Sequence, residues 1–259
     1  MTFSERHVNA DGFTVRVLEA GSGAPVVYLH GAGGLHLTKA HELLAQRYRV
    51  VALEIPGFGA DTENSRTTSF EELATTMARA VEAAGVRGGY TLVGTSFGGT
   101  TALHMALADP DPAGDEAAAG IEALVLISPA AFHPEGWQRP APADMARALF
   151  VRPENVPPRD PPPPGQVAFL QRLRGSIDQD ALRARLAEVR IPTLVLCGTE
   201  DGVLPPEMGR IYRAQMPNCT LLYVWDAAHE LTSDRPEALA AVIADFADRR
   251  EAFIVGVGD

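Results

Sequence analysis

Cysteine is nearly absent from this sequence, which has two of them, Cys197 and Cys219, in 259 residues. Two cysteines are too few for a disulfide framework, and their separation does not match a metal-ligand pattern. Cys197 lies inside an apolar run and Cys219 just before another. We therefore expect both side chains to be buried as small hydrophobic residues.

Long apolar runs are also missing. No run in the sequence is long enough to cross a bilayer. Residues 1–12 are polar and contain no apolar core of a secretory signal. These absences predict no membrane partner and no export, and we expect a cytoplasmic, reducing location.

The chain lacks an excess of basic residues, having 22 Lys and Arg against 33 Asp and Glu and a formal net charge of −11. Binding to a phosphate backbone depends on clustered Lys and Arg, so we expect no nucleic-acid partner. Internal repeats are missing as well. What remains is an ordinary composition, 46% hydrophobic and 21% charged, which predicts a folded globular protein. Separately from the composition, we expect a monomer or a homodimer whose partner is a small molecule.

Strand-like and helix-like patterns alternate along most of the chain. Asp11-Gly12 separates the first two predicted strands and is typical of a tight hairpin turn. Ser69 with Glu72 three residues later predicts a capping box at a helix start. Strands are predicted at 3–8, 14–19, 25–29, 50–53, 90–93, 121–127, 193–197 and 221–225, and helices at 39–47, from 69, after 96, at 206–216 and at 235–246. Such alternation predicts an α/β fold with a mostly parallel sheet and helices on both faces.

The pattern changes between residues 131 and 190. Prolines cluster at 153, 157, 158 and 161–164, and amphipathic pieces lie at 145–151, 167–173 and 180–189. The apolar stripes of these pieces need a surface to cover. We therefore expect residues 131–190 to form a helical lid inserted into a core domain of residues 1–130 and 191–259.

The most informative stretch is Gly94-Thr95-Ser96-Phe97-Gly98-Gly99, which follows the apolar residues 90–93 and precedes a helical pattern. In the pattern G-x-S-x-G, the serine lies on a strained strand-to-helix turn that exposes its hydroxyl above the sheet. The glycines on either side allow neighbouring backbone to pack closely. We predict Ser96 to be a nucleophile.

A serine nucleophile needs a base, a carboxylate that orients the base, and donors for the oxyanion. His229 follows the last predicted strand among small residues, and it is the favoured base among seven histidines. His30 is expected to brace its own loop, and His41 to lie on or near a surface helix. Asp201, in a loop after a strand, is the favoured acid over the three competing acidic residues, Glu200, Asp226 and Asp234.

The predicted oxyanion donors are the backbone N–H groups of Ala32 and Phe97. The run of small residues from Gly31 to Gly34 would let the backbone approach a substrate carbonyl. Predicted substrate-binding residues are Gly31, Gly33, Phe97, His133 and Trp137. Phe97 can equally be core beneath the lid.

Several pieces of the chain together resemble the α/β-hydrolase superfamily over nearly its whole length. The matching pieces are HGAGG from His30, PGFG from Pro56, GTSFGG from Gly94, GTEDGVLP from Gly198 and AAHE from Ala227. The order Ser96, Asp201, His229 is also that of the superfamily. The resemblance implies a hydrolase that needs no metal and no organic cofactor, with a lid before the strand that starts at Thr193.

The resemblance favours cleavage of a small carboxylic ester, lactone or thioester through an acyl-enzyme on Ser96. Carbon–carbon bond hydrolases of aromatic degradation have similar motifs but usually carry tryptophan after the base, where this chain has Glu230. Dehalogenases and epoxide hydrolases of this fold would carry aspartate in place of Ser96. Some members place the acid one strand earlier, where this chain has Ser128. A ligand-binding protein that lost turnover is a further alternative.

Overall fold

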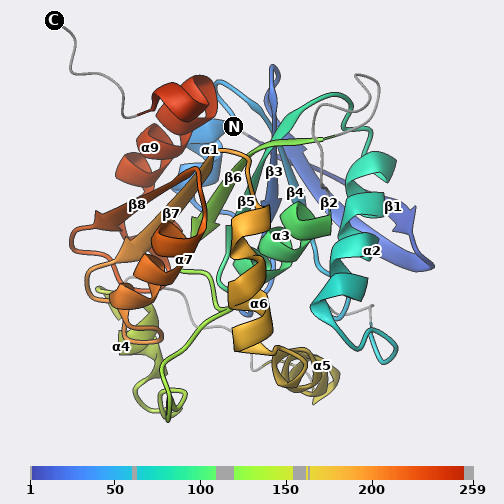
Figure 1. The fold of residues 1–259 in the computed structure, drawn as a ribbon. Coiled ribbons are helices and arrows are strands. Elements are labelled where there is room, and N and C mark those ends of the chain that lie inside the picture. The colour runs from blue at the N-terminus through green and yellow to red at the C-terminus, as the bar shows by residue number, and fades with distance from the viewer. Residues whose placement is uncertain (1, 60–62, 109–119, 154–161, 163, 254–259) are drawn as a thin grey trace, which may run out of the picture.

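The computed structural model describes residues 2–59, 63–108, 120–153, 162 and 164–253. They contain an eight-stranded sheet with the order β1-β2-β4-β3-β5-β6-β7-β8 (Figure 1). The strands are β1 (Ser4–Ala10), β2 (Phe13–Ala20), β3 (Pro25–Leu29), β4 (Arg49–Leu53), β5 (Tyr90–Thr95), β6 (Ile121–Ile127), β7 (Thr193–Gly198) and β8 (Cys219–Val224).

The first two strands form the predicted hairpin. Asp11 and Gly12 both have positive φ values, 51° and 75°, as a two-residue turn matching the twist of the strands requires. β1 pairs antiparallel with β2, and β2 antiparallel with β4. From β4 to β8 all pairs are parallel, so the prediction of a mostly parallel sheet is confirmed.

Helices cover both faces of the sheet. Successive residues of the central strands point to opposite sides, and because both sides are apolar, each face needs a covering layer. In β3, Val26 and Tyr28 pack with one apolar cluster, while Val27 and Leu29 pack with the other. The first cluster lies under α1 (Lys39–Leu44), α8 (Leu231–Asp234) and α9 (Pro236–Arg249), and the second under α2 (Phe70–Ala83), α3 (Phe97–Ala108) and α7 (Gly209–Gln215).

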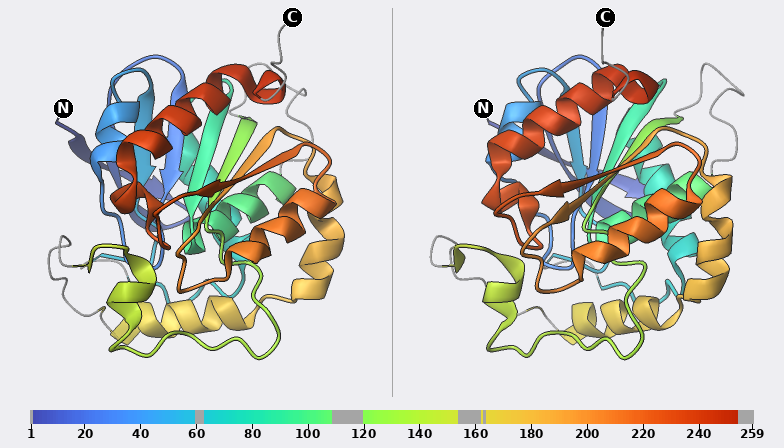
Figure 2. Two further views of the ribbon diagram at one scale, coloured as in Figure 1. Left: turned by 90° about the vertical axis from the view of Figure 1, so that its left-hand side faces the viewer. Right: turned by 60° about the vertical axis from the view of Figure 1, so that its left-hand side comes forward.

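The segment between β6 and β7 contains α4 (Met145–Leu149), α5 (Pro164–Gly175) and α6 (Gln179–Arg185), followed by a short 3₁₀ turn, η2 (Leu186–Glu188). Two further 3₁₀ turns are η3 (Pro206–Met208) and η4 (Arg250–Ala252). Figure 2 shows α4 and α5 beyond one end of the sheet, whereas α6 turns back beside α7. Most of the proline cluster lies outside the described residues.

The end of α1 and the start of α2 differ from the sequence pattern. The helix predicted at 39–47 ends at Leu44, and the amides of Gln46 and Arg47 bond to carbonyls three residues back. This tighter turn allows the chain to enter β4 at Arg49. The capping box at Ser69 is only half formed: the amide of Glu72 donates to Ser69 Oγ. The Glu72 carboxylate accepts instead from the Thr68 amide, at 2.8 Å, one residue before the cap.

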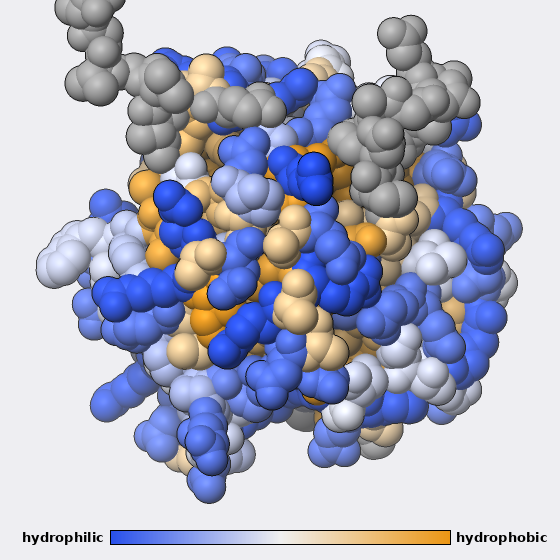
Figure 3. All heavy atoms as spheres, in the orientation of Figure 1, coloured by the Kyte–Doolittle hydropathy of each residue, from blue (hydrophilic) through white to orange (hydrophobic). Residues whose placement is uncertain are grey.

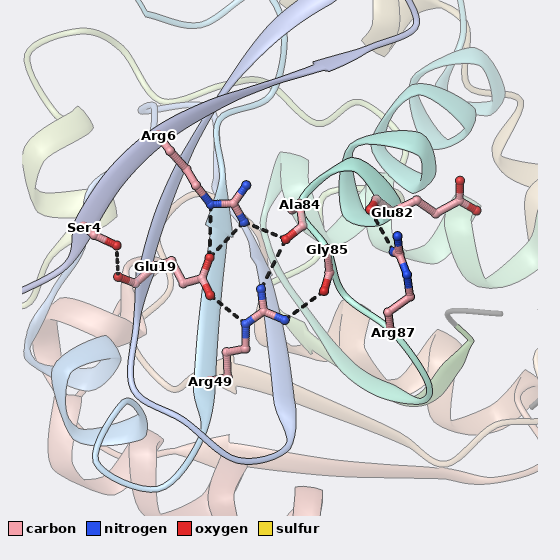
Figure 4. Close-up of polar contacts among 8 residues, drawn as sticks. All are labelled: Ser4, Arg6, Glu19, Arg49, Glu82, Ala84, Gly85 and Arg87. Atoms are coloured by element: carbon pink, nitrogen blue, oxygen red, sulfur yellow. Dashed lines mark hydrogen bonds and ion pairs between the residues drawn. The ribbon is translucent and has the colours of Figure 1, made fainter. Parts of the chain in front are cut away.

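Two arginines attach the C-terminal end of α2 to the hairpin. The guanidinium groups of Arg6 and Arg49 both donate to Glu19 and both donate to the carbonyl of Ala84 (Figure 4). Burial raises the pKa of Glu19, but the hydrogen bonds from Arg49 and Arg6 outweigh it and leave the pKa below its usual value. Cations beside the last carbonyls of a helix also complement its dipole.

Most large apolar side chains lie in the two clusters. Hydrophilic residues predominate on the face seen in Figure 3, with hydrophobic ones scattered among them. Large hydrophobic residues that are exposed in the described part are Val167, Tyr223 and Trp225. Among the helices formed by described residues, none combines the length and apolar content that a membrane crossing needs.

His41 lies in the helix α1, and its side chain is buried on the inner face of that helix. Its ring lies edge-on to Tyr28, and its Nδ1 accepts the amide of Thr38 at 2.9 Å. The ring therefore serves as part of the cap of α1 and packs beneath it. Burial lowers the pKa of His41 to about 4 and that of His30 also to about 4.

These two histidines predict an acid-sensitive fold. The unfolded chain binds protons at both rings near pH 6.5, and the folded chain only near pH 4, so stability falls as the pH decreases between these values. Each ring should lower the free energy of unfolding by about 2 kcal/mol between pH 7 and pH 5. Urea unfolding of His41→Gln at both pH values should show a pH effect smaller by about that amount. His133→Gln, at an exposed position, is the control, and a pH effect equal in both variants would contradict the assignment.

Candidate active site

Ser96 lies on the sharp turn that joins β5 to α3, and its φ is +52°. Its amide donates to the carbonyl of Ile127 on β6 at 2.8 Å, and its carbonyl accepts the Thr100 amide in α3 at 3.0 Å. A Cβ at Gly98 would lie 2.4 Å from the carbonyl oxygen of Leu29. Glycine is therefore required where α3 crosses the end of β3, and the strained backbone at Ser96 is held from both sides.

The strand order brings the loops of the site together. The chain leaves β3 toward β4 on one side and later returns to β5 on the other side of β3. In an open parallel sheet, this reversal leaves a crevice beyond the carboxyl ends of the two strands. Leu29 at the end of β3 pairs with Gly94. The loops after β3 and β5 therefore flank the crevice.

The structure brings Ser96, His229 and Asp201 into one hydrogen-bonded line. Nε2 of His229 lies 2.8 Å from Ser96 Oγ, and Nδ1 lies 2.9 Å from Asp201 Oδ2. The side chains of His229 and Asp201 are 3% and 2% exposed. Because a carboxylate oxygen only accepts, Nδ1 carries the proton, which leaves Nε2 free to accept the proton of the Ser96 hydroxyl.

Both oxygens of Asp201 are used. Oδ2 faces the imidazole, while Oδ1 accepts the backbone amides of Val203 and Leu204, each at 2.9 Å. The carboxylate is therefore held in one orientation by its own loop. Hydrogen bonds of this kind also stabilise its charged form against burial.

The three competing acidic residues lie elsewhere. Asp226 pairs with Arg152 at 2.7 Å and with Arg235 at 3.4 Å. Asp234 accepts the amides of Ala228 and Val151, and so supports the loop that carries His229. The side chain of Glu200 is exposed.

His30 holds the peptide that carries the predicted Ala32 donor. The amide of Ile55 donates to Nε2 of His30 at 2.9 Å, so in the neutral ring the proton is on Nδ1. Nδ1 then donates to the carbonyl of Gly31 at 2.7 Å. That carbonyl belongs to the same peptide group as the N–H of Ala32. His30 therefore braces its loop as expected, and does so at the peptide group that carries the predicted Ala32 donor.

Helix α5 packs against the same region through one face. Gln166 donates to the carbonyl of Ala32 at 3.2 Å, and Arg172 donates to the carbonyls of Thr67 and Asn64. Between them, the buried ring of Phe169 lies 5.9 Å from that of Phe97. Gln166 was not among the predicted site residues, because a glutamine after a proline cluster carries no local signal of contact with a distant loop.

The predicted substrate-binding residues lie in three places. Gly31 is close to Ser96, since a Cβ on it would meet Ser96 Cβ at 3.4 Å, and Gly33 is exposed in the same loop. Phe97 is buried among Phe58, Phe70 and Phe169. The ring of His133 stacks on Trp137 and contacts Gln179, while the Trp137 indole bonds to Val203.

Within the described ranges, no group of three or more His, Cys, Asp or Glu side chains is placed to hold a metal ion. The two cysteines are free and buried, as predicted. Burial raises the pKa of Cys197 to about 12 and that of Cys219 also to about 12, so neither thiol is a ready nucleophile.

The sheet order and the turn at Ser96 are those of the α/β-hydrolase fold. The sequence pattern of the Alpha/beta hydrolase family matches residues 26–242, so the chain belongs to this family. It is an α/β-hydrolase.

Relatives cover most of the chain at low identity. A putative carbamate hydrolase, RutD, of Azorhizobium caulinodans is 25% identical over 252 residues, which are 87% of this chain and 92% of the relative. The 2-hydroxy-6-oxo-6-(2'-aminophenyl)hexa-2,4-dienoic acid hydrolase of Metapseudomonas resinovorans is 24% identical over 275 residues, covering 96% of this chain and 92% of the relative. The crystal structure of naproxen esterase from Bacillus subtilis, 15% identical, superposes with a TM-score of 0.72 over 94% of this chain and 91% of that chain.

Proposed function

We propose that the protein is a serine hydrolase that cleaves a small carboxylic ester, lactone or thioester through an acyl-enzyme on Ser96. The observation that carries the proposal is the buried line of hydrogen bonds, 2.8 Å from Ser96 Oγ to His229 Nε2 and 2.9 Å from His229 Nδ1 to Asp201. A serine hydroxyl is a weak nucleophile until an adjacent base can accept its proton.

In the proposed reaction, Nε2 of His229 takes the hydroxyl proton as Ser96 Oγ attacks the substrate carbonyl. The Asp201 carboxylate stabilises the imidazolium that forms. The carbonyl oxygen becomes an oxyanion and accepts the N–H groups of Ala32 and Phe97. Phe97 begins α3, so its N–H belongs to the first turn of the helix, where amides lack partners within the helix.

The leaving alcohol or thiol then takes the proton from His229, and the acyl group stays on Ser96. Water enters, gives its proton to Nε2 and attacks the acyl carbonyl. Collapse of the second intermediate returns the proton to Ser96 and releases the acid. In this proposal Gly31 and Gly33 border the reacting carbonyl, and residues 131–190, with α5 seated on the oxyanion loop, act as the lid over the acyl group.

A carbon–carbon bond hydrolase is the second candidate, because the relative from Metapseudomonas resinovorans spans 96% of the chain and is named for such a substrate. Against it stands Glu230, whose position directly after the base is usually tryptophan in the resembling hydrolases. The two candidates share the nucleophile and differ in the bond that breaks.

One experiment separates the candidates. The protein is incubated with p-nitrophenyl acetate and butyrate, with a vinylogous diketone, and with a fluorophosphonate probe. The proposal expects rapid p-nitrophenol release, an intact diketone by mass spectrometry, and one probe adduct on the peptide containing Ser96. Diketone cleavage without ester turnover would establish the second candidate. A protein that neither labels nor turns over ester would be a ligand-binding member of the family.

A further inference from the structure

We infer that Trp137, in the segment between β6 and β7, is a positioning residue for the acid of the site: its indole N–H holds the peptide group that in turn holds Asp201. The inference rests on the proposed function, in which Asp201 orients the base. It gives Trp137 a task other than contact with the substrate.

The contact runs through a single peptide group. Nε1 of Trp137 donates to the carbonyl of Val203 at 2.9 Å. The N–H of that same peptide group is the amide of Leu204, which donates to Asp201 Oδ1 at 2.9 Å. In a trans peptide the C=O and N–H point in opposite directions, so the indole and the carboxylate lie at opposite ends of one planar unit.

The line continues to the nucleophile. Asp201 Oδ2 accepts from His229, and His229 accepts from Ser96. Hydrogen bonds in such a chain polarise one another, so a donor on the Val203 carbonyl strengthens the Leu204 amide as a donor to Asp201. Loss of the indole donor would therefore weaken the hold on Asp201 without removing any group that touches the substrate.

The indole ring is itself held in place. The Trp137 amide donates to the carbonyl of Pro134 at 3.1 Å, and the ring stacks on His133 with centroids 5.1 Å apart. Gln179, at the start of α6, accepts the backbone amide of His133 at 2.9 Å. A turn and a helix of the inserted segment thus fix the direction of the indole N–H.

The inserted segment also holds both loops of the site by backbone contacts near α4. The amide of Gly202, next to Asp201, donates to the carbonyl of Ala148 at 3.2 Å, and the amide of Glu230, next to His229, donates to that of Leu149 at 2.9 Å. These contacts survive a side-chain substitution. The Trp137 contact with the Val203 carbonyl depends on the indole side chain, so a single substitution removes it.

The test compares Trp137→Phe with Trp225→Phe, a matched control at the other tryptophan, which is 74% exposed. Loss of one hydrogen bond should lower kcat for p-nitrophenyl acetate about 3- to 10-fold, with KM nearly unchanged. In an Asp201→Asn background the same substitution should cost nothing further, because its effect passes through the carboxylate. Trp137→His, which keeps a ring N–H, should recover part of the rate.

A higher KM with unchanged kcat would overturn the inference in favour of a substrate contact, and an equal loss in the Asp201→Asn background would place the effect elsewhere. The low-field proton resonance of His229 Nδ1–H, assigned by its loss in His229→Gln, needs no turnover. It should shift in Trp137→Phe and stay in place in Trp225→Phe. If the resonance shifts in Trp137→Phe but the protein hydrolyses no ester, the proposed function fails and the positioning role of Trp137 is kept. If the resonance does not shift in Trp137→Phe, the positioning role is overturned.

Discussion

Replacing Ser96 by alanine is expected to lower kcat for p-nitrophenyl esters by about 10⁶, to the background of the assay. In the proposed mechanism the Ser96 Oγ atom attacks the carbonyl, and its hydroxyl is the group whose proton Nε2 of His229 accepts. Without Oγ the acyl-enzyme cannot form, although the oxyanion peptides and the crevice remain. Fluorophosphonate labelling should disappear together with turnover, as measured by intact-protein mass.

Ser128 offers a closely matched control. It directly follows the neighbouring strand β6, has a φ of +41° and is buried. Its amide donates to the carbonyl of Leu196 at 2.8 Å, much as that of Ser96 does to the carbonyl of Ile127. Among the described residues its hydroxyl has no hydrogen-bond partner. Ser128→Ala should therefore keep full ester turnover and full labelling. Residual turnover in Ser96→Ala comparable with that of Ser128→Ala would remove Ser96 from the mechanism.

Replacing Asp201 by asparagine is expected to lower kcat by about 10⁴. The amides of Val203 and Leu204 both point at the Oδ1 position and require an acceptor there. The asparagine carbonyl must therefore take that position, and its NH₂ group turns toward His229. Nδ1 then has to accept, the ring proton moves to Nε2, and Nε2 can no longer accept the proton of Ser96.

Measurement of kcat for p-nitrophenyl esters across a pH series tests the loss expected in Asp201→Asn. The variant Asp226→Asn is the control. Asp226 also follows a strand of the same edge, but its carboxylate bonds to Arg152 and Arg235. The control should retain a rate close to that of the unmodified protein, with both variants checked by urea unfolding. Full activity in Asp201→Asn, or an equal loss in Asp226→Asn, would show that a different group orients the base.

The strands of the sheet could be predicted because the patterns that indicate them, apolar runs and turn residues, are local in the sequence. The runs 25–29 and 121–127 are strands with the predicted bounds, and Asp11-Gly12 forms the hairpin turn. A continuous apolar run predicts a strand covered on both faces whatever the rest of the chain does. The G-x-S-x-G turn is local in the same way, because Gly94 and Gly98 are needed within a few residues of Ser96.

The sequence ranked four candidates for the acid of the site but did not decide between them. Glu200, Asp201, Asp226 and Asp234 all follow strands that end at one edge, and spacing along the chain does not measure distance across that edge. The structure separates them: Glu200 is exposed, two arginines bind Asp226, Asp234 accepts backbone amides, and Asp201 faces the imidazole of His229.

The sequence by itself determined the alternation of strands and helices, the turn at Ser96 and the loops that carry the candidate site residues. The tertiary structure decided which of these residues touch. The ring of His41 packs against Tyr28 of the strand β3, Gln166 reaches Ala32 because α5 lies beyond the end of the sheet where the loop after β3 begins, and Trp137 meets Val203 across 66 residues of chain. Contacts of this kind depend on the packing of remote elements, and a short stretch of sequence holds no periodic pattern from which they could be read.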